Sequence, residues 1–86
     1  TDAACIDGAI SAIRDNSRGG AQLVVVHQAL VDEVGHASGW GSEAQLEAMK
    51  TLDTRVASLV EAVEEVDPDW DESLLLITAY HGAIPD

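Results

Sequence analysis

Three side chains that could hold a metal ion lie in two short polar segments of this sequence. Asp32 and His36 are four residues apart, close enough to reach one ion from a single turn of chain, and His81 follows the second of two apolar runs. Carboxylate oxygen and imidazole nitrogen are donors that catalytic zinc accepts. Each signal alone also fits an ordinary hydrogen-bonded loop residue. The three together indicate a site for zinc or another divalent metal, provided that the fold brings them together.

The elements that must position these side chains follow from the hydrophobic pattern. Isoleucines at 6, 10 and 13 share one helical face, and apolar residues recur every three to four positions between 46 and 66. The runs 23–26 and 74–77 are continuous and apolar, which is typical of strands buried on both faces in parallel sheets. The expected elements are helix 2–15, strand 22–29, a glycine-rich loop 32–41 of metal-binding type, long helix 43–66 and strand 73–79.

This order predicts an α/β fold. A helix is followed by a right-handed β-α-β unit whose two strands are parallel. Ligands of such sheets gather beyond the carboxyl ends of the strands, so Asp32, His36 and His81 are expected to meet at one rim. Two parallel strands do not make a stable sheet alone. Residues 1–86 are therefore expected to form a single partial α/β domain, which more chain or a partner subunit completes.

Composition limits the classes of partner. The chain has 86 residues, with sixteen acidic and four basic side chains, and a net charge of −12. Such a balance argues against nucleic acid and against an anionic membrane surface. It suits a divalent metal or a basic partner, although a solvated acidic surface explains the charge as well. The apolar runs are too short for membrane insertion, and Cys5, the only cysteine, excludes an internal disulfide.

For five further residues, the sequence predicts a role in packing or at a turn with less specificity. His27 lies inside the first apolar run and is expected to be packed or hydrogen-bonded rather than to be a ligand. Cys5 and Met49 are expected in the core. Trp40 could either line a pocket or cap the core. Trp70 is expected to anchor the connection between the long helix and the second apolar run.

Two motifs and their connection resemble the alkaline phosphatase superfamily, most closely its type I phosphodiesterase / nucleotide pyrophosphatase branch. They are Asp-x-x-Gly-His at 32–36 and Thr-Ala-Tyr-His-Gly at 78–82, joined by a long helix that contains Leu-Asp at 52–53. The resemblance covers about residues 22–83. It implies a two-zinc hydrolase of phosphate esters or diesters, with an alkaline-phosphatase-like sheet sandwiched by helices. By position, Asp32 and His36 would bind the first metal and His81 the second.

The sequence also departs from the family pattern. Tyr80 stands where the family has a metal-binding Asp, and a phenol with a pKa of about 10 is a poor ligand at neutral pH. The family's upstream Ser or Thr nucleophile, its upstream Asp ligand and its downstream His have no counterpart in these 86 residues, so no catalytic residue is assigned.

These features predict a section or degenerate relative of a metal-dependent phosphoester hydrolase that is not catalytic by itself. Its partners would be the remaining part of the hydrolase domain or other subunits. The alternatives are a non-catalytic structural subunit derived from that fold, and an acidic metal- or protein-binding module unrelated to phosphatases.

Overall fold

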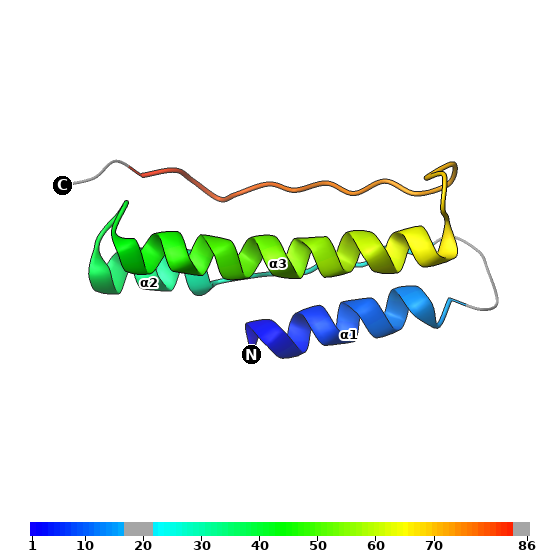
Figure 1. Cartoon of the computed structure of the whole chain (residues 1–86), viewed down its shortest axis with the longest axis horizontal. Coiled ribbons are helices and arrows are strands. Elements are labelled where there is room, and N and C mark those ends of the chain that lie inside the picture. Colours follow the sequence, from blue (N-terminus) through cyan, green and yellow to red (C-terminus); the bar gives the residue numbers. More distant parts are fainter. Residues whose placement is uncertain (17–21, 84–86) are drawn as a thin grey trace.

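A computed structural model describes residues 1–16 and 22–83, which form three helices (Figure 1). They are α1 (Asp2–Arg14), α2 (Leu30–Ser38) and α3 (Glu43–Val66). Helix α3 runs along the length of the molecule. Helix α2 packs beside its N-terminal half, and α1 packs beside its C-terminal half. The long helix therefore packs against both of the other helices.

Local capping explains where α1 and α3 begin. The Thr1 hydroxyl accepts a hydrogen bond from the amide of Ala4 at 3.1 Å, and the Ser42 hydroxyl accepts one from the amide of Gln45 at 3.2 Å. Each bond satisfies an amide that has no partner within its helix. Helix α3 has the bounds that its periodicity predicts, and α1 ends one residue before the predicted helix 2–15.

An ion pair aligns the C-terminal ends of α1 and α3. Arg14 donates two hydrogen bonds to Glu65, from Nε to Oε2 at 2.7 Å and from Nη2 to Oε1 at 3.0 Å. The hydrogen bonds and the charge of the guanidinium lower the pKa of Glu65. The same hydrogen bonds and the charge of the carboxylate raise the pKa of Arg14. The two helices consequently run in the same direction, with their ends in register (Figure 1).

The core is small and lies between α1, α3 and the segment that precedes α2. Ile6 and Ala9 of α1 pack with Leu59 of α3, and four partly buried residues surround them: Ile10, Ile13, Val24 and Val26. In segment 22–29 the side chains alternate. Val24 and Val26 face the core, whereas Leu23 and Val25 are 89% and 83% exposed. The predicted burial of this run on both faces was therefore wrong.

The predicted α/β fold was also wrong. No residue within 1–16 and 22–83 is in a strand, so the structure contains neither the parallel β-α-β unit nor an alkaline-phosphatase-like sheet over these residues. Segments 22–29 and 73–79 are extended and run in the same direction (Figure 1), but no backbone hydrogen bond joins them. The backbone of both apolar segments is extended, as the β propensity of their residues predicts. Without paired backbone groups, an extended segment is not a strand.

Three smaller expectations also need correction. Residues 32–38 of the predicted loop 32–41 belong to α2, and only the turn around Gly39 and Gly41, both with positive φ, is irregular. Cys5 is exposed, and the side chain of Met49 is 48% exposed, so neither belongs to the core. Over the described part of the chain, no helix combines the length and the apolarity that crossing a membrane needs.

Candidate functional site

The structure brings the three predicted site residues together. Asp32 and His36 lie one turn apart on α2, with 3.4 Å between Asp32 Oδ1 and His36 Nε2. His81, after the extended segment 73–79, places its Nε2 3.4 Å from the same Asp32 oxygen. The three side chains are between 50% and 67% exposed. One carboxylate oxygen therefore lies between two imidazoles that are 45 residues apart in sequence.

Trp40 flanks both imidazoles. Its ring meets the ring of His36 edge-on, with centroids 5.1 Å apart, and that of His81 in the same way at 6.1 Å. It also lies against Gly35, where a Cβ atom would come within 2.6 Å of the indole. Of the two roles considered for Trp40, lining the site is the one that these contacts support.

Gln45 ties this region to α3. The side chain is only 4% exposed. Its Nε2 donates to the carbonyl of Val31 at 3.2 Å, and its Oε1 accepts from the amide of Gly41 at 2.6 Å. The capping pattern Ser42-x-x-Gln45 was the only sequence signal of this residue. It indicated a helix start but not the contact with α2.

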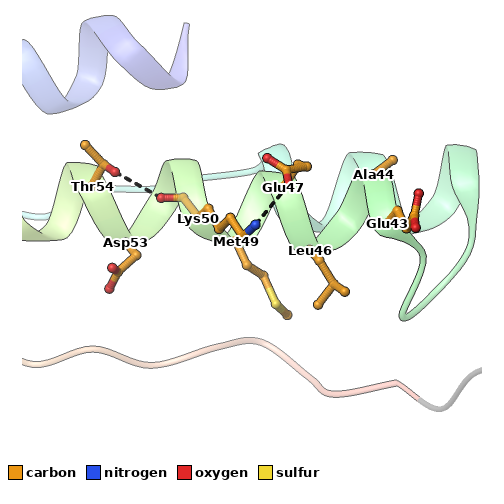
Figure 2. A pocket seen from close by; sticks show the side chains of 8 residues that line it. All are labelled: Glu43, Ala44, Leu46, Glu47, Met49, Lys50, Asp53 and Thr54. Carbon is orange, nitrogen blue, oxygen red and sulfur yellow. Dashed lines mark hydrogen bonds and ion pairs between the residues drawn. The ribbon is translucent and has the colours of Figure 1, made fainter.

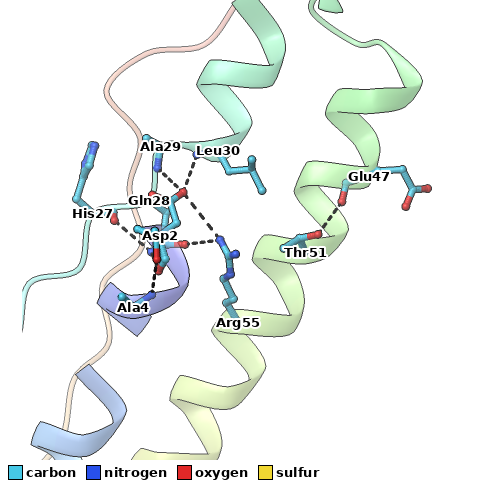
Figure 3. A network of polar contacts seen from close by, with 10 residues as sticks. Asp2, Ala4, His27, Gln28, Ala29, Leu30, Glu47, Thr51 and Arg55 are labelled. Carbon is cyan, nitrogen blue, oxygen red and sulfur yellow. Dashed lines mark hydrogen bonds and ion pairs between the residues drawn. The ribbon is translucent and has the colours of Figure 1, made fainter. Parts of the chain in front are cut away.

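A second polar cluster, centred on Asp2, holds the first residues of α2 (Figure 3). Asp2 Oδ2 accepts hydrogen bonds from the amides of Ala29 at 2.9 Å and Leu30 at 2.8 Å. Arg55 of α3 lies beside it and donates to the Gln28 side chain at 2.9 Å. Sequence reasoning missed both Asp2 and Arg55, because no local pattern indicates contacts between residues so far apart.

A surface groove lies elsewhere on the molecule. It follows the outer face of α3, where Leu46, Met49 and Asp53 point toward the C-terminal extended segment (Figure 2). Lys50 and Glu47 pair across this face at 3.1 Å. None of the three predicted site residues lines this groove. The chemistry of Asp32 and the two imidazoles is therefore separate from it.

A family model for type I phosphodiesterase / nucleotide pyrophosphatase matches residues 3–85. The chain belongs to this family. The match confirms the resemblance inferred from the two motifs and makes the chain a relative of these hydrolases. A search of curated proteins found no match, and neither did a search of solved structures.

Tyr80, which precedes His81 in the second motif, contacts a different residue from its neighbour. Its side chain is 88% exposed, and its hydroxyl lies 3.5 Å from His27 Nδ1, with the two ring centroids 5.6 Å apart. His27 is also exposed, so it is not packed, although it has this hydrogen-bonding contact. The phenol is thus held beside His27.

The donor set can be compared with the geometry that zinc requires. Zinc lies about 2.0–2.1 Å from its oxygen and nitrogen ligands, so two ligands of a tetrahedral site are about 3.3 Å apart. The two 3.4 Å separations at Asp32 Oδ1 match such ligand pairs. Within residues 1–16 and 22–83, however, no three acidic, His or Cys side chains are already arranged as a metal-binding group. The donors fit zinc by type and by paired spacing, but not as a finished triad.

Proposed function

We propose that this chain is the metal-binding section of a phosphoester hydrolase, in which Asp32, His36 and His81 hold a divalent metal, zinc by the chemistry of the donors. The observation that supports the proposal is the convergence of both imidazoles on one Asp32 oxygen, in a chain of the type I phosphodiesterase family. The remaining ligands and the nucleophile would come from the remaining part of the hydrolase domain or from another subunit.

Each residue of the site would have a separate role in binding the metal. A bound divalent metal supplies a Lewis acid that polarises a phosphoryl oxygen. Asp32 provides the negative charge that makes cation binding favourable, and the two imidazoles provide neutral donors on either side of it. Trp40 would help to orient both rings, which it contacts in T-shaped geometry. The partly exposed position of the three side chains leaves room for further ligands and for a phosphate group.

The surface that the rest of the domain would cover is formed by the two extended segments. Leu23 and Val25 of the first, and Leu74, Leu76 and Ile77 of the second, are each at least 71% exposed. Within the described part of the chain, the backbone groups of 22–28 and 73–83 form no backbone–backbone hydrogen bond. Exposed apolar side chains are costly in water, and backbone groups without a partner in the chain are free to pair with another polypeptide, so both features favour coverage.

Metal titration of the complete protein that carries this chain tests the proposal. Wild type is expected to bind zinc, and Asp32→Asn or His81→Gln to weaken binding at least about tenfold. Glu33→Gln, which changes the neighbouring exposed carboxylate, and His27→Gln are matched controls that should bind like wild type. Metal-free wild type, or equal affinity in Asp32→Asn, would refute the metal site.

Tyr80→Asp tests the departure from the family pattern. A carboxylate at this position adds the ligand type that the phosphodiesterase family uses there, so the variant is expected to bind more metal per chain than wild type. Inductively coupled plasma mass spectrometry of the purified protein measures that ratio. An unchanged ratio would show that Tyr80 is not what limits metal binding.

A non-catalytic structural subunit is the second candidate. It is favoured by the exposed side chain of Tyr80, which contacts His27. The two candidates differ in turnover. If the complete protein hydrolyses an aryl phosphodiester and Asp32→Asn abolishes that activity, the hydrolase is supported. A stable metal-loaded assembly without turnover supports the subunit.

A further inference from the structure

Helix α2 carries Asp32 and His36 but has no cap of its own. Ala29 occupies its N-cap position and has no side-chain oxygen that could accept a bond from the first amides. The amides of Ala29 and Leu30 instead donate to Asp2 Oδ2, at 2.9 and 2.8 Å (Figure 3). The cap therefore comes from another helix, 27 and 28 residues away in sequence.

Asp2 itself is held through its backbone and its side chain. The side-chain amide of Gln28 donates to the backbone carbonyl of Asp2 at 2.9 Å, and Arg55 Nη1 donates to the Gln28 side-chain oxygen at 2.9 Å. Arg55 Nη1 also lies 3.9 Å from Asp2 Oδ2. The side chains of Asp2 and Arg55 are only 24% and 21% exposed, so solvent screens this cluster less than an exposed ion pair. One carboxylate thus connects α1, the start of α2 and the middle of α3.

The position of this cap determines the position of the site. Leu30 is the first residue of α2, and Asp32 follows in the same turn. A negative charge at a helix N-terminus is stabilised by the unpaired amides and by the helix dipole. If the first turn frays, Asp32 Oδ1 moves relative to His81, which belongs to a different segment of the chain. His36, one turn further on, depends less directly on the cap.

We propose that Asp2 is a positioning residue for the Asp32–His36–His81 site, acting by capping α2 from α1. The role rests on the proposed function, because it presumes that this site binds metal. It extends that function to a residue that belongs to neither motif and precedes the matched residues 3–85. It also assigns a role to Gln28 and Arg55, which hold Asp2 in place through its backbone carbonyl and its carboxylate.

The test compares Asp2→Ala, Asp2→Asn and Asp7→Ala in the complete protein that carries this chain. Cobalt(II) is the probe, because its affinity and its visible absorption band report on ligand geometry. Asp2→Ala is expected to weaken cobalt binding roughly fivefold, to shift the band, and to speed hydrogen exchange at the amides of Ala29 and Leu30 by a similar factor. Asp2→Asn should restore all three, since Asn caps as well as Asp. Asp7→Ala, an exposed carboxylate on the same helix, should match wild type.

The outcomes separate this role from the proposed function. No cobalt binding by wild type overturns the metal site, and the role of Asp2 with it. Cobalt binding by wild type that is unchanged in affinity and spectrum in Asp2→Ala overturns the role of Asp2 alone. In that case faster amide exchange would mean that the cap serves only stability. Failure of Asp2→Asn to restore binding also contradicts a role by capping.

Discussion

Close packing explains why a glycine precedes His36. An added Cβ at Gly35 would lie 2.6 Å from Gln45 Nε2 and 2.6 Å from the Trp40 ring, closer than real Cβ contacts allow. Gln45 is buried and already bonded at both ends of its amide, so it cannot move away without losing a hydrogen bond. The glycine of the first motif therefore lets α2, Trp40 and α3 approach each other behind the two imidazoles.

Gly35→Ala is accordingly expected to destabilise the fold by about 1–3 kcal/mol, the usual cost of overpacking. Urea unfolding measures the change. Gly8→Ala is the matched control, because no heavy atom lies within 4 Å of its added Cβ and the residue is exposed in α1. Helix propensity predicts a gain of up to about 1 kcal/mol there. Similar free energies of unfolding for the two variants would contradict the packing argument.

At the residue scale, the sequence predicts the residues of the site better than the residues that hold them in position. Asp32, His36 and His81 could be picked out because each follows an apolar run and two of them share one turn. Asp2 and Arg55 could not, since their contacts join residues more than 25 positions apart. The side-chain bonds of Gln45 were equally hidden, because a capping pattern predicts only local partners.

Among the elements, the turn after α3 depends on one carboxylate. Asp67 accepts hydrogen bonds from the Ser73 hydroxyl at 2.7 Å and from the amides of Glu72 and Asp71 at 2.9 and 3.2 Å. The Ser73 bond contributes most, followed by the Glu72 amide, and together they lower the pKa of Asp67 below its ordinary value of 3.8. Trp70, with φ of 56°, belongs to the same turn, and its amide donates to the carbonyl of Asp67 at 3.0 Å.

This lowered pKa predicts the direction of an acid transition. Because the folded-state pKa lies below the unfolded one, the stabilisation by ionised Asp67 is complete above about pH 5. It is lost as the pH falls through the ordinary value and then through the lowered folded value. Unfolding midpoints measured from neutral pH downward should show a smaller acid loss in Asp67→Asn than in wild type. Glu65 also has a lowered pKa, so part of the loss should remain. An unchanged acid loss in Asp67→Asn would contradict the assignment.

Helices α1 and α3 could be predicted from the sequence, whereas α2 was expected as a loop and the two expected strands do not form. The contrast between the two predicted helices and the missing strands has one physical reason. A helix satisfies its backbone hydrogen bonds within itself, so the apolar period and Ser42 are enough to locate α3. A strand needs a neighbour about 4.8 Å away, and composition cannot say whether one is present. Segments 22–29 and 73–79 have the residues of strands and an extended backbone, but no ladder forms between them.

For the molecule as a whole, two features act in opposite directions on association between chains. The exposed apolar segments favour it, and the high net charge opposes it. The described chain measures 49 × 22 × 17 Å, so little of it lies far from solvent. The charge of −12 makes chains repel one another, but salt limits that repulsion to about 8 Å at 0.15 M. Apolar contact acts at shorter range and is not screened.

The 86-residue chain produced alone is therefore expected to self-associate, and more so as salt is raised. Sedimentation velocity measures the size distribution. Replacing Leu23 and Leu76 by Ser, on the two extended segments, should shift it toward monomer. Leu46→Ser, which changes a half-exposed leucine on the outer face of α3, is the control and should have little effect. A cooperatively folding monomer at high salt would mean that these segments need no cover.

The two indoles of this chain lie at opposite ends of the long helix. Trp40 adjoins both imidazoles, whereas Trp70 belongs to the turn beyond Val66. The fluorescence of Trp40 can therefore report on changes at the site. In a Trp70→Phe background the emission comes from one indole only, and any ion or phosphate ester that reorients either neighbouring ring should change its intensity, so ligands can be screened without an added dye.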